Sequence, residues 1–492
     1  MTRKQMAAAV ALSTALGLPH LRAAEPGAPV AVVRIGRSEK ICQLTGDTDW
    51  ETGRPTAART FANAGLDAAD LGYPVEHGGK LILLFGDSWP PPHGGGAAGE
   101  IPADDAVGVS LRSAPPTGAD GRCLELEVHH DMLPAGHARA GARQPQAAHP
   151  PRFAPATIVG PALVKQGFFN VPAGGVSAGG ALFAFFWTDH CSDPNRLKPS
   201  PGDPLARPST DPAHDCPETD HRNSLGRGVL ARSDDLGRTF SQVVAMPTGF
   251  VYATAVNAEP LRELPAAQRL GVFIFASPRY RASAPYLAYA PAQSFADPGS
   301  WRFFTGRAAD GQPKWVSRDA WAGPSGPPNA ARTAPWNAPG EPELLAAGPP
   351  GERSVGELSV TWNRPLGMWL MLHGSARGIV ARVARAPWGP WSEPSTILSG
   401  DDGLGCRLVM TENGCGGRRD FWPGKRKNGK FVGGGLYAPY VLNRYTTAAA
   451  GDGASRGATI YWLISTWNPY EVTVMRTTLR SASPSPRQAV EP

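Results

Sequence analysis

One strand pattern recurs five times along this chain of 492 residues, and it constrains the fold more than any other feature. In each copy, turn residues come before a short apolar run that ends near a polar or aromatic residue. With one residue of each run as a marker, the copies follow one another at steps of 101, 90, 97 and 91 residues. The markers are Leu81, Leu182, Val272, Trp369 and Ile460.

A second short strand, carrying small and basic residues, is expected after each of these runs. Two paired strands with looser flanking segments are what a four-stranded propeller blade requires. The sequence therefore predicts an all-β protein folded as a five-bladed β-propeller. Two tandem β-sandwiches are the alternative, but they would not be expected to repeat one strand pattern five times at nearly equal spacing. The second strands are expected at residues 107–112, 228–232, 286–290, 379–384 and 472–478.

The composition agrees with a folded chain of short strands joined by turns. Hydrophobic residues make up 41% and charged residues 18%, which excludes a disordered chain and a long coiled coil. The 58 glycines and 51 prolines suit many turns. Because the 48 Lys and Arg residues are scattered, we expect no nucleic-acid partner. We expect one catalytic propeller domain at residues 40–481, after a linker at 25–39 and before a disordered tail at 482–492.

The N-terminal segment indicates export. Arg3 and Lys4 precede an apolar run at residues 6–18, so residues 1–24 are interpreted as a signal peptide, with a short ordered helix as the alternative. The run is too short to span a bilayer, and no later segment is apolar enough to do so. We expect a secreted or periplasmic protein, and a monomer.

Six cysteines fit disulfides in an oxidising compartment. None of them forms a Cys-x-x-Cys pair. Fifteen pairings are possible, and the interpretation we favour is Cys42 with Cys123, Cys191 with Cys216, and Cys406 with Cys415.

The hairpin at residues 70–87 is the most informative segment for function. Gly78-Gly79 is a strong signal for a two-residue turn, because glycine tolerates the positive φ angles of such turns. If the turn is centred there, opposed residues have numbers that sum to 157, which sets Asp70 directly opposite Asp87. Like charges directly opposed on two strands destabilise a fold.

Paired carboxylates are, however, what glycosidic cleavage needs: one protonates the leaving oxygen and the other acts as nucleophile or base. The alternative is that one aspartate caps a strand end or binds backbone N–H groups while the other is solvated. A bulge at Pro74 would also break the register.

Several further motifs make the chain resemble a bacterial family of unknown function, some of whose members are secreted endo-D-arabinanases. The motifs are Asn63-x-Gly65 before residues 70–72, residues 85–89, 277–281, 286–288, 356–363, 389–392 and 465–470. The resemblance covers nearly the whole chain after the signal peptide. It implies a five-bladed propeller glycosidase with its site on the central axis and with Asp70 and Asp87 as the catalytic aspartates. The family pattern has Gly-Thr where this chain has Ala68-Ala69, and Thr-Phe is usual where it has Ser88-Trp89. These departures keep both carboxylates and concern the substrate subsite.

Other candidates for substrate binding each have a structural alternative. Asp189 is a third carboxylate or a loop residue, and Glu357 approaches the channel or is a solvated strand end. Arg279 and Arg281, which flank Tyr280, bind sugar hydroxyls or lie on the surface. The aromatic candidates offer flat faces to sugar rings or pack between blades. They are Trp89, Trp362, Tyr437, Tyr440, Trp467 and Tyr470.

A turn motif at residues 233–240 matches the Asp-box of sialidase-like propellers, so Asp235 is expected to be structural. Motifs of metalloproteases, nucleotide-binding proteins and common serine hydrolases are absent from the sequence. We therefore expect no cofactor and no catalytic metal, with a structural ion on the axis left open. The favoured interpretation is a polysaccharide-cleaving glycoside hydrolase, and the alternative is a non-catalytic glycan-binding propeller.

Overall fold

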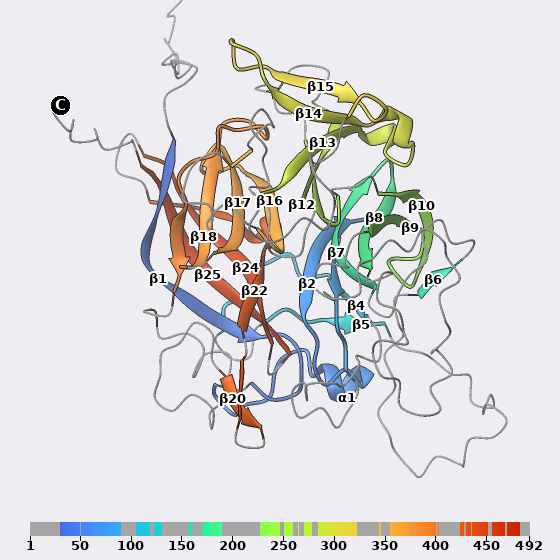
Figure 1. The fold of residues 1–492 in the computed structure, drawn as a ribbon. Helices are drawn as coiled ribbons and strands as arrows, with labels where there is room; N and C mark the ends of the chain where they lie inside the picture. The colour runs from blue at the N-terminus through green and yellow to red at the C-terminus, as the bar shows by residue number, and fades with distance from the viewer. Residues whose placement is uncertain are drawn as a thin grey trace, which may run out of the picture.

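The computed structural model describes most of the predicted strands of the chain (Figure 1). The described residues are 30–49, 51–89, 105–118, 123–129, 157–159, 170–188, 227–246, 250–258, 264, 270–277, 284–321, 344–345, 355–375, 377–399, 402, 424–427, 430–433, 435–450, 455–467 and 470–482. The expected signal peptide lies outside these residues, as does the expected C-terminal tail apart from Ala482.

Five sheets of four or five strands form the five blades of a β-propeller, as the repeat predicts. In order from the axis outward, blade one is β2 (Leu71–His77), β3 (Lys80–Phe85), β4 (Val107–Ser110) and β5 (Glu127–Val128). Blade two is β7 (Asn170–Ala178), β8 (Ala181–Thr188), β9 (Arg227–Ser233), β10 (Thr239–Ala245) and β6 (Thr157–Val159). Blade three is β11 (Tyr252–Asn257), β12 (Gly271–Ser277), β13 (Tyr286–Pro291), β14 (Arg302–Arg307) and β15 (Pro313–Ser317).

Blade four is β16 (Leu358–Asn363), β17 (Met368–Ser375), β18 (Gly378–Ala384) and β19 (Ser395–Leu398). Blade five is β22 (Gly435–Val441), β24 (Gly457–Trp467), β25 (Glu471–Ala482) and β1 (Ala31–Gln43), with β23 (Thr447–Ala449) beside β24. A separate hairpin consists of β20 (Gly424–Lys427) and β21 (Lys430–Gly433). The recurring strand pair of the sequence is thus the second and third strand of each blade.

The five inner strands form a closed ring around the axis. β2 contacts β7, β7 contacts β11, β11 contacts β16, β16 contacts β22, and β22 returns to β2. Because blades stack face to face, their middle strands are buried on both faces, and β12 and β18 have no exposed residue. This stacking explains why the repeated strands are continuous apolar runs rather than alternating ones.

The N-terminal strand closes the ring. β1 pairs antiparallel with β25, so blade five combines strands from both ends of the chain (Figure 1). Residues 31–39, expected as part of a linker, belong to this closing strand. This pairing holds the N-terminal and C-terminal parts of the repeat together, because each blade is stabilised only by the blades next to it.

A disulfide between Cys42 and Cys123 strengthens the same closure. Cys42 lies in β1 of blade five, and Cys123 lies just before β5 of blade one. The predicted pairing of these two cysteines is confirmed. A loop of 81 residues closed by a disulfide stabilises a fold by about 4 kcal/mol on chain-entropy grounds. The pairs Cys191–Cys216 and Cys406–Cys415 lie outside the described residues and stay predictions.

The Asp-box has the predicted structural role at the turn between β9 and β10. Asp235 Oδ1 accepts hydrogen bonds from the Thr239 backbone N–H at 2.9 Å and the Ser233 hydroxyl at 2.8 Å. Its Oδ2 accepts another from the Thr239 hydroxyl at 2.7 Å. Burial raises the pKa of Asp235, but these hydrogen bonds outweigh it and hold the pKa below its usual value.

Helices contribute little to the described part of the fold. It contains one α-helix, α1 (Thr60–Ala64), and three short 3-10 turns, η3 (Ala292–Ser294), η4 (Pro298–Ser300) and η6 (Asn443–Tyr445). Among the described residues no helix has the length and apolar character needed to cross a membrane.

Candidate active site

The register of the β2–β3 hairpin follows the prediction over most of its length. Gly78 and Gly79 form the turn with φ angles of 57° and 76°. His77 pairs with Lys80, and the predicted pairing continues as far as Tyr73 with Leu84. The turn signal in the sequence therefore identifies the hairpin and its register correctly.

The direct opposition of Asp70 and Asp87 is wrong, because a β-bulge shifts the register by one residue. Leu71 pairs with Phe85, which leaves Gly72 as the extra residue of β2. The Gly86 backbone N–H then donates to the Asp70 carbonyl oxygen at 3.1 Å, so Asp70 lies beside Gly86. The bulge lies nearer the strand end than the bulge at Pro74 that the sequence left open.

The bulge holds a leucine in a strained conformation next to Asp70. Leu71 has φ 59° and Gly72 has φ 73°, both in the left-handed region. A residue with a Cβ atom costs about 1–2 kcal/mol there. Leu71 is 3% exposed and packs in the core, which holds it in place. A bulge bends its strand and redirects the neighbouring side chains, and here the redirected side chain is a buried aspartate.

Asp70 is held by a tyrosine of blade five. Its side chain is 6% exposed, and Oδ2 accepts a 2.6 Å hydrogen bond from the Tyr437 hydroxyl. Tyr437 also lies beside a bulge, since the register of β22 shifts between Tyr437 and Tyr440 and Ala438 has φ 55°. Tyr437 is itself 7% exposed, so its ring offers little face to a sugar, and its hydroxyl instead orients a carboxylate.

Asp87 lies two residues after the end of β3 and is partly buried. Its Oδ2 accepts a 3.3 Å hydrogen bond from the Tyr470 hydroxyl. Burial raises the pKa of Asp87 to about 6, although the hydrogen bond from Tyr470 works in the opposite direction. A carboxyl group with such a pKa carries a proton for an appreciable fraction of the time near neutral pH.

The ring of Trp89 packs against the ring of Tyr470. The two rings lie 5.6 Å apart at 41°, and together with Ala68 they form a small buried cluster. Trp89 is 6% exposed. Its position beside the catalytic candidates agrees with the sequence, but its ring packs on Tyr470 rather than facing outward.

Gly86 lets the Asp70 carboxylate lie close to the strand that carries Asp87. A Cβ atom at Gly86 would lie 2.5 Å from Asp70 Oδ1 and 2.6 Å from Val171 Cγ1. Any larger residue would therefore displace the carboxylate. This close approach, rather than a turn, requires glycine at this position.

Later residues of all five inner strands line one cavity on the axis, so these strands run in the same direction and their first residues lie at the other end of the propeller. Asp70 precedes β2 at that end, and the buried Glu357 precedes β16 there. Trp187, near the end of β8, stacks on Tyr252, the first residue of β11, with the rings 4.9 Å apart. Sequence reasoning did not select Trp187 or Tyr252. The available signal was that Trp187 is the last residue of the apolar run in the second copy of the repeat.

The remaining predicted residues do not all meet at this end. Trp362 lies near the opposite end of β16, so it is separated from Asp70 and Asp87. Trp467 is the last residue of β24 and pairs with Gly435, which places its backbone at the candidate site. Tyr440, the last residue but one of β22, is fully buried and packs against Tyr73. Four candidates lie outside the described residues, namely Asp189, Arg279, Tyr280 and Arg281.

The described residues bring no group of three or more His, Cys, Asp or Glu side chains together in a way that could hold a metal ion. Two aspartates, one with a raised pKa, and two tyrosine hydroxyls can donate and accept protons at one end of the axis.

Comparisons with known proteins identify a family but no activity. A family model described as "Domain of unknown function (DUF4185)" matches residues 223–476, just over half of the chain. The matched range begins in blade two and ends in blade five, so Asp70 and Asp87 lie outside it. No curated protein matches this chain.

Among solved structures, the Hadza microbial sialidase Hz136 is 11% identical, with 87% of this chain and 67% of that chain covered and a TM-score of 0.31. A subtype N11 neuraminidase-like protein of A/flat-faced bat/Peru/033/2010 (H18N11) is 10% identical, with coverage of 93% and 98% and a TM-score of 0.29. The hemagglutinin-neuraminidase ectodomain of parainfluenza virus 5 is 8% identical, with coverage of 85% and 70% and a TM-score of 0.29. Likenesses this distant do not bear on the activity of this chain.

Proposed function

This chain belongs to the DUF4185 family, and we propose that it is an exported glycoside hydrolase that cleaves arabinofuranosyl-type linkages. In this proposal it acts like an endo-D-arabinanase on a cell-wall or capsular polysaccharide, with Asp70 and Asp87 as the catalytic residues. The family description names no activity, so the proposal rests on the candidate site and on the motifs that resemble those of endo-D-arabinanases.

The two aspartates have different surroundings, which suits different catalytic roles. Asp87, whose burial raises its pKa to about 6, is assigned to protonate the leaving glycosidic oxygen. Asp70, whose Oδ2 accepts the hydrogen bond from Tyr437, is assigned as the nucleophile or as the base that activates water. The proton lost by Asp87 in the first step returns from water at the end of the cycle.

The observation that carries the proposal is that each aspartate is held by one tyrosine hydroxyl at the same end of the axis. A glycosidase must hold its two carboxyl groups at a separation of about 5–9.5 Å, and fixed hydrogen bonds serve this purpose. The bulges beside Asp70 and Tyr437 add support, because strained backbone is concentrated at functional sites.

Release of reducing ends from purified D-arabinan and L-arabinan tests this function. The proposal expects release from D-arabinan, at a rate proportional to enzyme concentration, and loss of that release in the Asp70→Asn variant. Binding of arabinan without any cleavage would replace the hydrolase with the non-catalytic glycan-binding propeller. Cleavage of L-arabinan alone would keep the hydrolase and overturn the D-arabinan assignment.

A further inference from the structure

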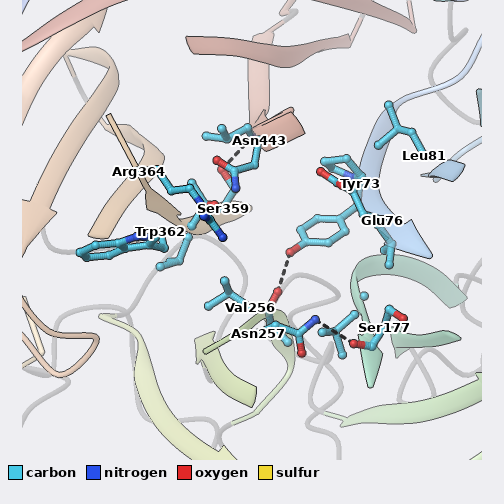
Figure 2. Close-up of a pocket in the computed structure, with 18 residues that line it drawn as sticks. Tyr73, Glu76, Leu81, Ser177, Val256, Asn257, Ser359, Trp362, Arg364 and Asn443 are labelled. Carbon is cyan, nitrogen blue, oxygen red and sulfur yellow. Dashed lines mark hydrogen bonds between the residues drawn. The ribbon is translucent and has the colours of Figure 1, made fainter. Parts of the chain in front are cut away.

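A cavity lies on the axis at the end of the inner strands opposite to Asp70. Its volume is about 150 Å³, and residues from all five blades line it (Figure 2). Of the β2 residues that line it, Tyr73 is three residues and Glu76 six residues along the chain from Asp70. The polar and aromatic side chains around it include Glu76, Ser177, Asn257, Trp362, Arg364 and Asn443.

A buried layer of side chains separates this cavity from the candidate active site. The Tyr73 hydroxyl hydrogen-bonds with the Thr254 hydroxyl. It also donates to the Ala255 carbonyl oxygen at 3.2 Å (the dashed line from Tyr73 in Figure 2), so β2 is tied to β11 across the axis. The Tyr73 ring packs against Tyr440 with centroids 4.8 Å apart. Tyr73, Thr254 and Tyr440 are 4%, 2% and 0% exposed. These buried side chains lie between the cavity and the end of the axis that carries Asp70.

Trp362 gives the cavity a fixed aromatic wall. Its ring is partly buried and packs edge-on against Trp369, with centroids 5.8 Å apart and an interplanar angle of 62°. Figure 2 shows the Trp362 ring at one side of the cavity, with Arg364 and Asn443 above it. A rigid indole with limited rotamer freedom is suited to stacking against the apolar face of a ring.

Neutral polar groups lie around this wall. The Asn257 amide is oriented by a 2.8 Å hydrogen bond from its Nδ2 to the Ser177 carbonyl oxygen, and the Ser177 hydroxyl is 2.8 Å from His77 Nδ1. Asn443 is exposed at the rim. Glu76 is paired with Arg444 at 3.7 Å, so its charge is largely balanced. One further guanidinium, that of Arg364, completes the rim, and the lining does not concentrate charge of one sign.

We propose that this cavity is a second, non-catalytic binding site for one neutral sugar ring. An aromatic wall with amides and hydroxyls matches a ligand that has an apolar face and many hydroxyl groups. The volume is below the roughly 300–1,000 Å³ of pockets for drug-sized ligands, which fits a single furanose or pyranose ring at the end of a chain or branch. This site is independent of hydrolysis.

The test measures binding of two neutral probes, methyl α-D-arabinofuranoside and methyl α-D-mannopyranoside, to the full chain by saturation-transfer NMR. We expect at least one probe to bind, and Trp362→Leu to weaken it by about tenfold through loss of the stacking face. The matched control is Trp315→Leu, because Trp315 is also partly buried and packs against the same apolar cluster but lies outside the cavity. This control should bind the probes as the parent does.

Asn443→Ala is the second variant, since Asn443 is exposed and its replacement should not affect folding. It should weaken the same probe several-fold. If neither probe binds, the proposed binding site is overturned. It is also overturned if Trp362→Leu and Asn443→Ala both bind the probe as the parent does. Preferential binding of D-glucuronate or inorganic phosphate overturns the neutral-sugar assignment. Reducing-end release from arabinan by the parent is assayed separately. If a probe binds in a way that depends on Trp362 but no arabinan is cleaved, the binding site is retained and the proposed hydrolase function is overturned.

Discussion

The Tyr437 hydroxyl donates a 2.6 Å hydrogen bond to Asp70 Oδ2 across 367 positions of the sequence. Tyr437 belongs to blade five and Asp70 precedes blade one, so this contact exists only because the propeller closes. The Cys42–Cys123 disulfide and the pairing of β1 with β25 hold that same closure. The geometry of the candidate site is thus coupled to the junction between the two ends of the chain.

Asp70→Asn and Asp87→Asn should each reduce turnover of arabinan by at least about 10²-fold, because an amide can neither protonate the leaving oxygen nor act as base or nucleophile. Initial rates of reducing-end release measure this. Asp310→Asn, at an exposed turn, is the control and should retain the parent rate. Near-parent turnover in either site variant would return that aspartate to a structural role.

The stability of Asp87→Asn should depend on pH in a defined direction. The pKa of Asp87 is raised from 3.8 to about 6, so the folded protein holds this proton more tightly than the unfolded chain does. The resulting stabilisation is full below pH 3.8 and is lost as the pH rises through 6. The melting temperature of the variant should therefore exceed that of the parent above pH 7, and by less near pH 4. A difference that is constant over this range would contradict the raised pKa.

Tyr470→Phe should move the alkaline limb of the activity profile to higher pH. The Tyr470 hydroxyl lowers the pKa of Asp87, so its removal raises that pKa further and keeps the acid protonated to higher pH. The readout is kcat/KM against pH. Tyr445→Phe is the control, since it removes a comparable hydroxyl hydrogen bond, to the Arg112 carbonyl oxygen at 2.7 Å, away from the site. Loss of stability in Tyr470→Phe without any shift of the limb would indicate a structural role only.

Gly86→Ala should lower both activity and stability. The new Cβ atom would lie 2.5 Å from Asp70 Oδ1, which forces the carboxylate or its strand to move. Overpacking of this kind costs about 1–3 kcal/mol. Gly374→Ala is the matched control, because no atom lies within 4 Å of the added methyl group. Thermal melting and arabinan turnover measured together decide the outcome, and a fully active Gly86→Ala enzyme would show that the position of Asp70 is not critical.

Asp235→Ala should destabilise the protein by about 1–2 kcal/mol and leave kcat unchanged. The substitution removes the carboxylate that accepts from Ser233 and Thr239 at the turn of blade two. The neighbouring Asp234→Ala removes an exposed ion pair with Arg232 and should have little effect. Denaturant unfolding compares the two variants. Equal stability of both would mean that the Asp-box does not stabilise the turn.

Local features of the sequence determined the blades and most of the hairpin. Turn glycines and apolar runs act over a few residues, so they predict where strands begin and how near neighbours pair. The five copies of the repeat, the turn at Gly78 and Gly79, and the structural role of Asp235 all follow from such local patterns. Tyr73 and Leu84 lie only a few residues from the turn, and the strand pairing predicted from the turn holds as far as these two residues.

Only the tertiary structure decided the arrangement at the strand ends. Whether a bulge forms depends on the residues that pack around it. Leu71 keeps its strained φ angle because its side chain is packed in the buried core. The partners of the two aspartates, Tyr437 and Tyr470, come from the last blade and approach only when β1 completes the ring. Periodicity and turn chemistry describe residues that are close along the chain, whereas these contacts join residues hundreds of positions apart. The sequence by itself therefore determined the blades, and the closed ring decided the geometry of the site.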